Sequence, residues 1–297
     1  MSRSTQKRLK VLKAFRSPRS SPDRGKHRYD RWRTLGMAVS QGILLAVPLT
    51  GLARVDFWGG RHFLLFQPVD LKRGLAGVIV GIAAMYVVTF TVNVVAGRMF
   101  CGWGCPVGQI SRFGEAVDTP GLKRPARWWA SAKGAGFSFL FVFAMLVWWV
   151  DPRVLWQGSP TALAGSWGVL LLGVAWSYAH GRYWRWKFCK TACPIGLYYS
   201  FVAPARWYGV YFRNQFDSCI ECNACDNVCP VDLAPRDLML PVPSPGGIAI
   251  AEAPGRNHCL ECGDCVRACE WIIAVKGEEP VPLLLGFHSG PKRVDSS

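Results

Sequence analysis

The chain is 297 residues long, which leaves room for two ordinary domains, and it is 51% hydrophobic and only 18% charged. This composition argues against an ordinary soluble protein and favours a membrane protein. The formal net charge is +16, and residues 1–33 carry twelve Lys or Arg against two Asp. A basic tail can bind nucleic acid, but here a hydrophobic stretch follows at once. We therefore interpret the tail as a cytoplasmic membrane flank and expect no nucleic-acid partner.

Four stretches without Asp, Glu, Lys or Arg follow the tail. Each is long enough, or nearly so with its aromatic flanks, to cross the roughly 30 Å hydrocarbon core of a bilayer. They are residues 34–53, 74–97, 134–150 and 161–179. Pro160 suits the first turn of the fourth helix, because proline lacks an N–H that would be unpaired there. A buried helix of a soluble protein is the alternative for any one stretch, but four in series predict a four-helix transmembrane domain.

Basic residues near the ends of these stretches predict the orientation. There are six Lys or Arg in residues 98–133 and four in residues 182–190, but four in residues 54–73 and one in residues 151–160. Cytoplasmic loops are enriched in Lys and Arg. We therefore expect a multi-pass protein of the bacterial inner membrane, surrounded by lipid, with both termini in the cytoplasm.

A pair of cysteines follows the second and the fourth stretch, each time in the pattern Phe-Cys-x3-Cys-Pro. The pairs are Cys101 with Cys105 and Cys189 with Cys193. The recurrence predicts a parallel internal repeat that brings both motifs to one membrane face. Three interpretations stay open: the four thiolates bind a third cluster or another soft metal, each pair is a redox dithiol, or the motif is only a turn that ends a helix.

The other eight cysteines form two runs with the spacing C-x2-C-x2-C-x3-C. Proline follows the first run, as Pro230, whereas Glu270 follows the second. This spacing lets one loop present three thiolates to a [4Fe-4S] cluster, and in two-cluster ferredoxins the fourth thiolate of each run binds the other cluster. We therefore predict two [4Fe-4S] clusters, one held by Cys219, Cys222, Cys225 and Cys269 and the other by Cys259, Cys262, Cys265 and Cys229.

Two alternatives to iron–sulfur binding fit this pattern less well. Structural zinc sites combine separated cysteine pairs, or cysteine with histidine, rather than two matching runs of four. Disulfides are disfavoured because the runs follow a cytoplasmic flank, where thiols stay reduced. Glu270 is expected to leave ligation intact and to influence the potential of a cluster. The Pro- and Gly-rich residues 235–257 predict an extended connection between the runs.

Together these features predict a mixed fold in three parts. They are a basic cytoplasmic tail in residues 1–33, a four-helix α-helical transmembrane domain with both C-x3-C-P motifs in residues 34–200, and a small α+β ferredoxin-like domain with two [4Fe-4S] clusters in residues 201–297. No catalytic side chain is identified. Asp56, Arg61 and His62, between the first two stretches, are candidates for a further site at the membrane surface.

The four stretches, the paired C-x3-C-P motifs and the two C-terminal runs resemble the NapH and MauN type of membrane ferredoxins over almost the whole chain. The NapH type is nearest in size and layout, and the NosR type, which has additional regions, is more distant. The resemblance implies the quinol dehydrogenase component of a respiratory chain. Such a protein takes electrons from membrane quinol and the quinone pool and passes them, through a partner ferredoxin or cytochrome, toward a periplasmic oxidoreductase.

The MauN branch of this resemblance implies an alternative role. There the iron–sulfur protein is an accessory to the maturation of a periplasmic enzyme of the methylamine dehydrogenase type. The motifs do not choose between nitrate, methylamine and other pathways. A redox sensor is disfavoured, because the sequence contains no recognisable output domain.

Overall fold

The computed structural model describes residues 28–118, 123–202, 208–212, 219–235, 258–276 and 281–287. Most of the predicted basic tail, up to residue 27, and the predicted connection at residues 236–257 lie outside the described residues. The chain divides into two compact units. The helical unit contains Leu35–Thr89 and Gly104–Arg185, and the cysteine-rich unit contains Met1–Thr34, Phe90–Trp103 and Trp186–Ser297.

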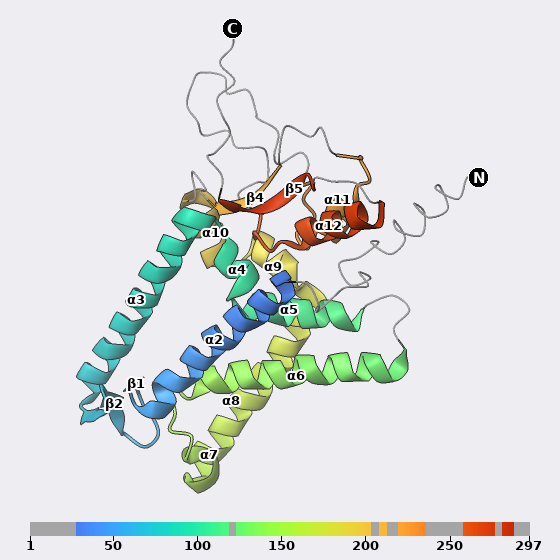
Figure 1. Cartoon of the computed structure of the whole chain (residues 1–297). Helices are drawn as coiled ribbons and strands as arrows, with labels where there is room; N and C mark the ends of the chain where they lie inside the picture. Colours follow the sequence, from blue (N-terminus) through green and yellow to red (C-terminus); the bar gives the residue numbers. More distant parts are fainter. Residues whose placement is uncertain are drawn as a thin grey trace. The chain divides into compact units, whose positions relative to one another are not determined.

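Long helices make up most of the helical unit (Figure 1). In chain order its helices are α2 (Arg28–Thr50) and α3 (Leu71–Ala96), which both extend into the cysteine-rich unit, then α5 (Pro106–Val117), α6 (Arg124–Leu146), α7 (Val154–Gln157), α8 (Pro160–Ala179) and the π-helical turn η1 (His180–Trp184). Pro160 occupies the first turn of α8 as predicted, and the Ser159 hydroxyl accepts a hydrogen bond from the Ala162 N–H at 3.3 Å.

Three helical segments in the described part of the chain are long and apolar enough to cross a membrane: Leu71–Ala96, Arg124–Leu146 and Pro160–Trp184. They coincide with or overlap the second, third and fourth predicted spans. The first predicted span lies mostly in α2, which is helical but is not among these segments. Helix α2 begins with charged residues and contains Pro48. The chain therefore has the helices of a membrane protein, and the four-span arrangement stays a prediction.

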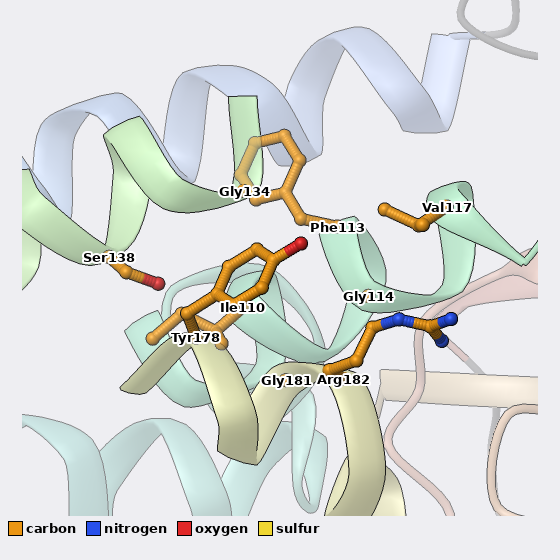
Figure 2. A pocket seen from close by; sticks show the side chains of 9 residues that line it. All are labelled: Ile110, Phe113, Gly114, Val117, Gly134, Ser138, Tyr178, Gly181 and Arg182. Carbon is orange, nitrogen blue, oxygen red and sulfur yellow. The ribbon is translucent and has the colours of Figure 1, made fainter. Parts of the chain in front are cut away.

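Glycines allow the helices of the helical unit to approach closely. Helix α6 packs against α5 and α8, and α5 also packs against η1. A methyl group on Gly114 of α5 would overlap the Gly181 carbonyl of η1, and one on Gly181 would overlap Ile110. This crossing encloses a small pocket, into which Tyr178 and Phe113 project (Figure 2).

A short antiparallel sheet joins α2 and α3. Its strands β1 (Ala53–Arg54), β2 (His62–Leu64) and β3 (Gln67–Val69) are adjacent in that order. Arg54 forms a buried ion pair with Asp151 at 2.9 Å and lies over the Phe63 ring. Val55 and Val78 are buried beneath the sheet, so the sheet is anchored to the start of α3.

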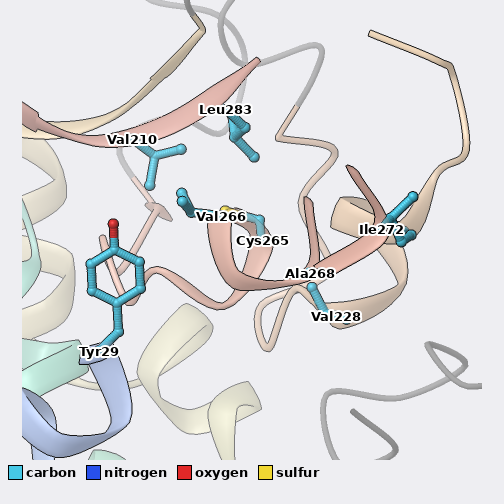
Figure 3. Close-up of a cluster of buried hydrophobic side chains, with 9 residues drawn as sticks. Tyr29, Val210, Val228, Cys265, Val266, Ala268, Ile272 and Leu283 are labelled. Carbon is cyan, nitrogen blue, oxygen red and sulfur yellow. The ribbon is translucent and has the colours of Figure 1, made fainter. Parts of the chain in front are cut away.

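The cysteine-rich unit contains short helices and one two-stranded sheet. Its helices are α4 (Met99–Trp103), α9 (Trp186–Thr191), α10 (Pro194–Val202), α11 (Ala224–Val228) and α12 (Asp264–Lys276). Strand β4 (Tyr208–Phe212) pairs antiparallel with β5 (Leu283–Phe287), with Tyr208 opposite Phe287. Val210, Val266, Leu283 and Tyr29, the last from the start of α2, meet in its core (Figure 3).

Candidate metal centres

Three cysteines of the first run share a pocket with one cysteine of the second run. Cys219 and Cys222 lie in the loop before α11, and Cys225 is at the start of that helix. The fourth cysteine, Cys269, projects from α12, and Ile272 and Leu283 supply apolar walls. We call this the first pocket; its cysteines are Cys219, Cys222, Cys225 and Cys269.

A second pocket has the reciprocal composition. Three of its cysteines come from the loop before α12 and the first turn of that helix, and the fourth follows α11. Val210 and Leu260 are among its apolar walls. We call this the second pocket; its cysteines are Cys259, Cys262, Cys265 and Cys229. The two pockets therefore group the cysteines as the crossed pattern of ligation requires.

The backbone has the same unusual conformation in both runs. Glu221 and Asn223 have φ angles of 51° and 54°, and the matching residues Glu261 and Gly263 have φ angles of 48° and 77°. Residues with side chains rarely adopt this left-handed region. Loops that turn in this way direct successive N–H groups into one concavity, which is a common setting for anions and iron–sulfur clusters.

The donor chemistry of both pockets fits an iron–sulfur cluster. Burial raises the pKa of Cys265 well above its usual value, and the nearby Cys262 and Cys259 raise it further. Burial also raises the pKa of Cys269 to about 12, and Cys222 adds to that shift. A metal centre would have to displace these protons, because thiolates are the ligands.

Within the described ranges, no group of three or more His, Cys, Asp or Glu side chains is close enough together to hold one metal ion. The preference for a [4Fe-4S] cluster over zinc rests on the spacing of the two cysteine runs, and it stays a prediction.

Sequence reasoning missed Glu261 and the residues that surround it. The Glu261 side chain is 1% exposed and accepts a hydrogen bond from the Val210 N–H of β4 at 2.7 Å. Its carbonyl accepts a bond from the Trp103 indole of α4 at 2.8 Å. A methyl group on Gly102 would lie 2.5 Å from the Leu260 carbonyl. Helix α4 thus supports the loop that carries Cys259 and Cys262.

The second cysteine of each C-x3-C-P motif is positioned to begin a helix. Cys105 is the N-cap of α5, which starts at Pro106 in the helical unit. Cys193 precedes α10, which starts at Pro194 in the cysteine-rich unit, and its sulfur accepts a bond from the Gly196 N–H at 3.4 Å. This is the position where proline is tolerated, because its missing N–H would be unpaired there. The Cys105 side chain makes no capping hydrogen bond to α5, and the cluster, dithiol and turn interpretations of both motifs stay predictions.

The first cysteines of the two motifs are buried close to Arg98. Cys101 on α4 and Cys189 on α9 are 9% and 6% exposed. Arg98 is 1% exposed and donates to the Cys189 carbonyl at 2.6 Å. Burial raises the pKa of the Cys101 thiol, and the positive charge of Arg98 opposes that shift. These contacts lie within the cysteine-rich unit, and a third metal site or a dithiol at these cysteines stays a prediction.

Asp56 and His62 meet in the helical unit, whereas Arg61 is exposed. The backbone N–H of Asp56 donates to Nδ1 of His62 at 3.2 Å. The Asp56 carboxylate accepts hydrogen bonds from the backbone N–H groups of Trp58 and Gly59. The side chain of Asp56 is fully buried. These bonds hold the loop between β1 and β2 in place, which gives the pair a structural role.

Comparison with known proteins identifies relatives. Over 229 residues the chain is 26% identical to the methylamine utilization ferredoxin-type protein MauN of Methylorubrum extorquens, covering 68% of this chain and 75% of MauN. It is 26% identical to protein RdxA of Cereibacter sphaeroides over 83% of this chain and 57% of RdxA. It is 23% identical to YccM of Escherichia coli, whose name refers to electron transport, over 63% of this chain and 53% of YccM.

The chain thus spans only about half the length of RdxA and YccM. No family model matches it, and no solved structure is significantly similar to it.

Proposed function

Because its homologues place this chain in the membrane-associated ferredoxin-type electron-transfer family, we propose that it carries electrons from membrane quinol toward a periplasmic oxidoreductase through two [4Fe-4S] clusters. One observation carries the proposal: each of two pockets is lined by three cysteines of one run and the fourth cysteine of the other. Each cluster would accept and release one electron at a time.

The chain's own residues have defined parts in this proposal. The first pocket would hold one cluster through its four thiolates, and the second pocket would hold the other. The apolar walls, which include Ile272 and Val210, limit the access of water to the metal centres. Low exposure to solvent is one of the factors that set the potential of a cluster.

We place the four spans in the bacterial inner membrane with both termini in the cytoplasm, as the distribution of Lys and Arg predicts. Three of the spans have the length and composition for this arrangement, and α2 would be the remaining one. The partners would be the quinone pool, a ferredoxin or cytochrome, and the periplasmic enzyme that receives the electrons. The proposed parts are the tail at 1–33, the membrane domain at 34–200 and the ferredoxin-like domain at 201–297.

A second candidate function rests on the similarity to MauN, whose name places it in methylamine utilization. In this alternative the clusters supply electrons for the maturation of a periplasmic redox enzyme of the methylamine dehydrogenase type. The same two pockets serve both functions, and only the electron donor and acceptor differ.

The test is anaerobic purification in detergent, followed by iron and sulfide quantification and by addition of a reduced quinol analogue. We expect about eight irons per chain, as two [4Fe-4S] centres require, and reduction of the clusters in visible and low-temperature EPR spectra. Loaded clusters that do not respond to quinol would favour the maturation role. A chain purified without iron would contradict both functions.

Iron quantification also tests the C-x3-C-P motifs. A chain with a third cluster would hold about twelve irons, and the double variant Cys101→Ser/Cys189→Ser would return it to about eight. An unchanged iron content in that variant, compared with the parent chain, would exclude a cluster and leave the dithiol and turn interpretations.

A further inference from the structure

We propose that Arg33, at the start of α2, raises the reduction potential of the cluster in the second pocket above that of the cluster in the first. This inference rests on the proposed function, because it presupposes both clusters. Arg33 lies outside the two cysteine runs, in the flank that precedes the first predicted span. Its role would make this flank part of the electron-transfer module.

Arg33 contacts the ligand loop of the second pocket directly. Its Nη1 atom donates to the Cys262 carbonyl at 3.1 Å and to the Asp264 carboxylate at 3.1 Å. Its Nη2 atom donates to Asp30, one turn earlier in α2. Arg267 of α12 completes the group, 3.7 Å from Asp30 and 4.0 Å from Asp264. Two arginines and two aspartates thus lie together beside Cys262.

Burial gives these charges a strong influence on the pocket. The Arg33, Asp264 and Arg267 side chains are 7%, 2% and 2% exposed. A charge in such a site is poorly screened by water, so it acts on a neighbouring centre far more strongly than a surface charge does. Hydrogen bonds from both Nη atoms also fix the guanidinium in place, so its charge cannot turn away from Cys262.

Arg33 specifically offsets a carboxylate that lies next to a cysteine of the second pocket. An oxygen of Asp264 lies 3.5 Å from the Cys262 sulfur. Alone, a carboxylate there would disfavour the additional negative charge of a reduced cluster. Arg33 offsets this carboxylate, so the group of two arginines and two aspartates has no net charge, and replacing Arg33 with a neutral residue would leave one negative charge beside Cys262. The potential of a cluster rises when nearby positive charge stabilises its reduced state.

The first pocket has a different electrostatic setting. An oxygen of Asp226 lies 3.4 Å from the Cys225 sulfur, and Glu270 directly follows Cys269. Arg28 pairs with Glu270, and its side chain is 61% exposed and therefore well screened.

Carboxylates adjoin the second pocket too, since Glu261 is buried beside Cys262 and bonds to the Val210 N–H. The pockets therefore differ in their arginines: Arg33 is buried beside the second pocket, whereas Arg28 is exposed beside the first, so the first cluster would have the lower potential. One electron would then pass from a reduced cluster in the first pocket to an oxidised cluster in the second, with no bond made or broken.

The test is an EPR-monitored redox titration of the anaerobically purified full chain. We expect Arg33→Gln to lower the midpoint potential of one cluster only, the one whose signal is lost in Cys262→Ala. Arg33→Lys keeps the charge and is expected to retain most of the parent potential. Arg31→Gln removes the same charge from an exposed position two residues away in the same helix, so it is the matched control and is expected to change neither potential.

A variant with the opposite sign separates charge from structural damage. Asp30→Asn removes a negative charge from the same group, so it is expected to raise the potential that Arg33→Gln lowers. The inference would be overturned if Arg33→Gln and Asp30→Asn shifted the midpoint potential in the same direction. It would also be overturned if both clusters were present and Arg33→Gln shifted the potential no more than Arg31→Gln does. Loss of the second cluster in both Arg33→Gln and Arg33→Lys would also overturn it and show a purely structural role. Absence of both clusters from the parent chain would instead contradict the proposed function.

Discussion

Cys229 and Cys269 end their own runs, yet each lines the pocket of the other run. This exchange couples the two halves of the cysteine-rich unit, because neither pocket has four cysteines without both runs. Cys229 directly follows α11 and Cys269 lies in α12, and these two helices pack against each other. The last cysteine of each run is therefore the residue that distinguishes crossed from uncrossed ligation.

We predict that Cys269→Ser removes the same cluster as Cys225→Ser, and that Cys229→Ser removes the same cluster as Cys262→Ser. Each variant should lose about four irons, as one [4Fe-4S] centre requires. EPR spectra of the reduced variants, with iron quantification, are the measurement. Loss of one signal by both Cys269→Ser and Cys262→Ser would show uncrossed ligation and contradict the two pockets.

Two ion pairs of the helical unit differ in burial, and burial determines how much an ion pair contributes to the stability of the chain. The Arg54 and Asp151 side chains are 9% and 5% exposed, whereas those of Arg73 and Asp70 are 79% and 58% exposed. Removing one partner from a buried pair leaves the other charge without compensation. An exposed partner is simply solvated.

We predict that Arg54→Met lowers the stability of the chain by about 3–5 kcal/mol, whereas Arg73→Met lowers it by about 1 kcal/mol or less. Thermal unfolding in detergent, followed by circular dichroism, is the measurement, and Arg73→Met is the matched control. Equal effects of the two substitutions would mean that Arg54 and Asp151 are solvated in the folded protein.

Helix α5 and the turn η1 cross at a pair of glycines. There is no room for a side chain at Gly114, because a methyl group would meet the Gly181 backbone. Small residues allow helices to approach this closely in membrane proteins, where packing rather than the hydrophobic effect holds them together. Gly136 of α6, in contrast, has open space around it, since a methyl group added there would have no neighbouring atom within 4 Å.

We predict that Gly114→Ala destabilises the chain, because two elements must separate to admit the methyl group; overpacking of this kind typically costs about 1–3 kcal/mol. Gly136→Ala is expected to be neutral or slightly stabilising, since alanine is the better helix former. The melting temperatures of both variants in the same detergent would test this pair. Similar losses at both positions would contradict the close crossing.

The predicted helices agree with the structure where a stretch is uniformly apolar, as in α3 and α8. The hydropathy pattern is less decisive for α2, because this helix begins with several charged residues and becomes apolar only after them. The start of this helix packs with the cysteine-rich unit, where Tyr29 lies in the core beside Trp103. Hydropathy does not reveal this contact, because it reports affinity for lipid and not which surface a helix covers.

For the whole molecule, the four-span arrangement and its orientation predict the side on which each loop lies. Alkaline phosphatase fused after Gly60 or after Gly158 should be active, because both positions would face the periplasm, whereas a fusion after Lys123 should be inactive. Fluorescent protein fused to either terminus should fluoresce. Fluorescence at the N-terminus together with an inactive fusion after Gly60 would mean that α2 does not cross the membrane.

The sequence by itself determined which cysteines form two runs and which helices are apolar enough for a bilayer, because spacing and hydropathy are local properties. Only the tertiary structure showed that Arg33 reaches the Cys262 carbonyl, 229 positions further along the chain, and that Glu261 bonds to β4. Contacts of this kind leave no periodic pattern, since their partners are chosen by packing. The cysteines of the candidate metal centres are therefore evident in the sequence, whereas the residues that surround them are determined by the tertiary structure.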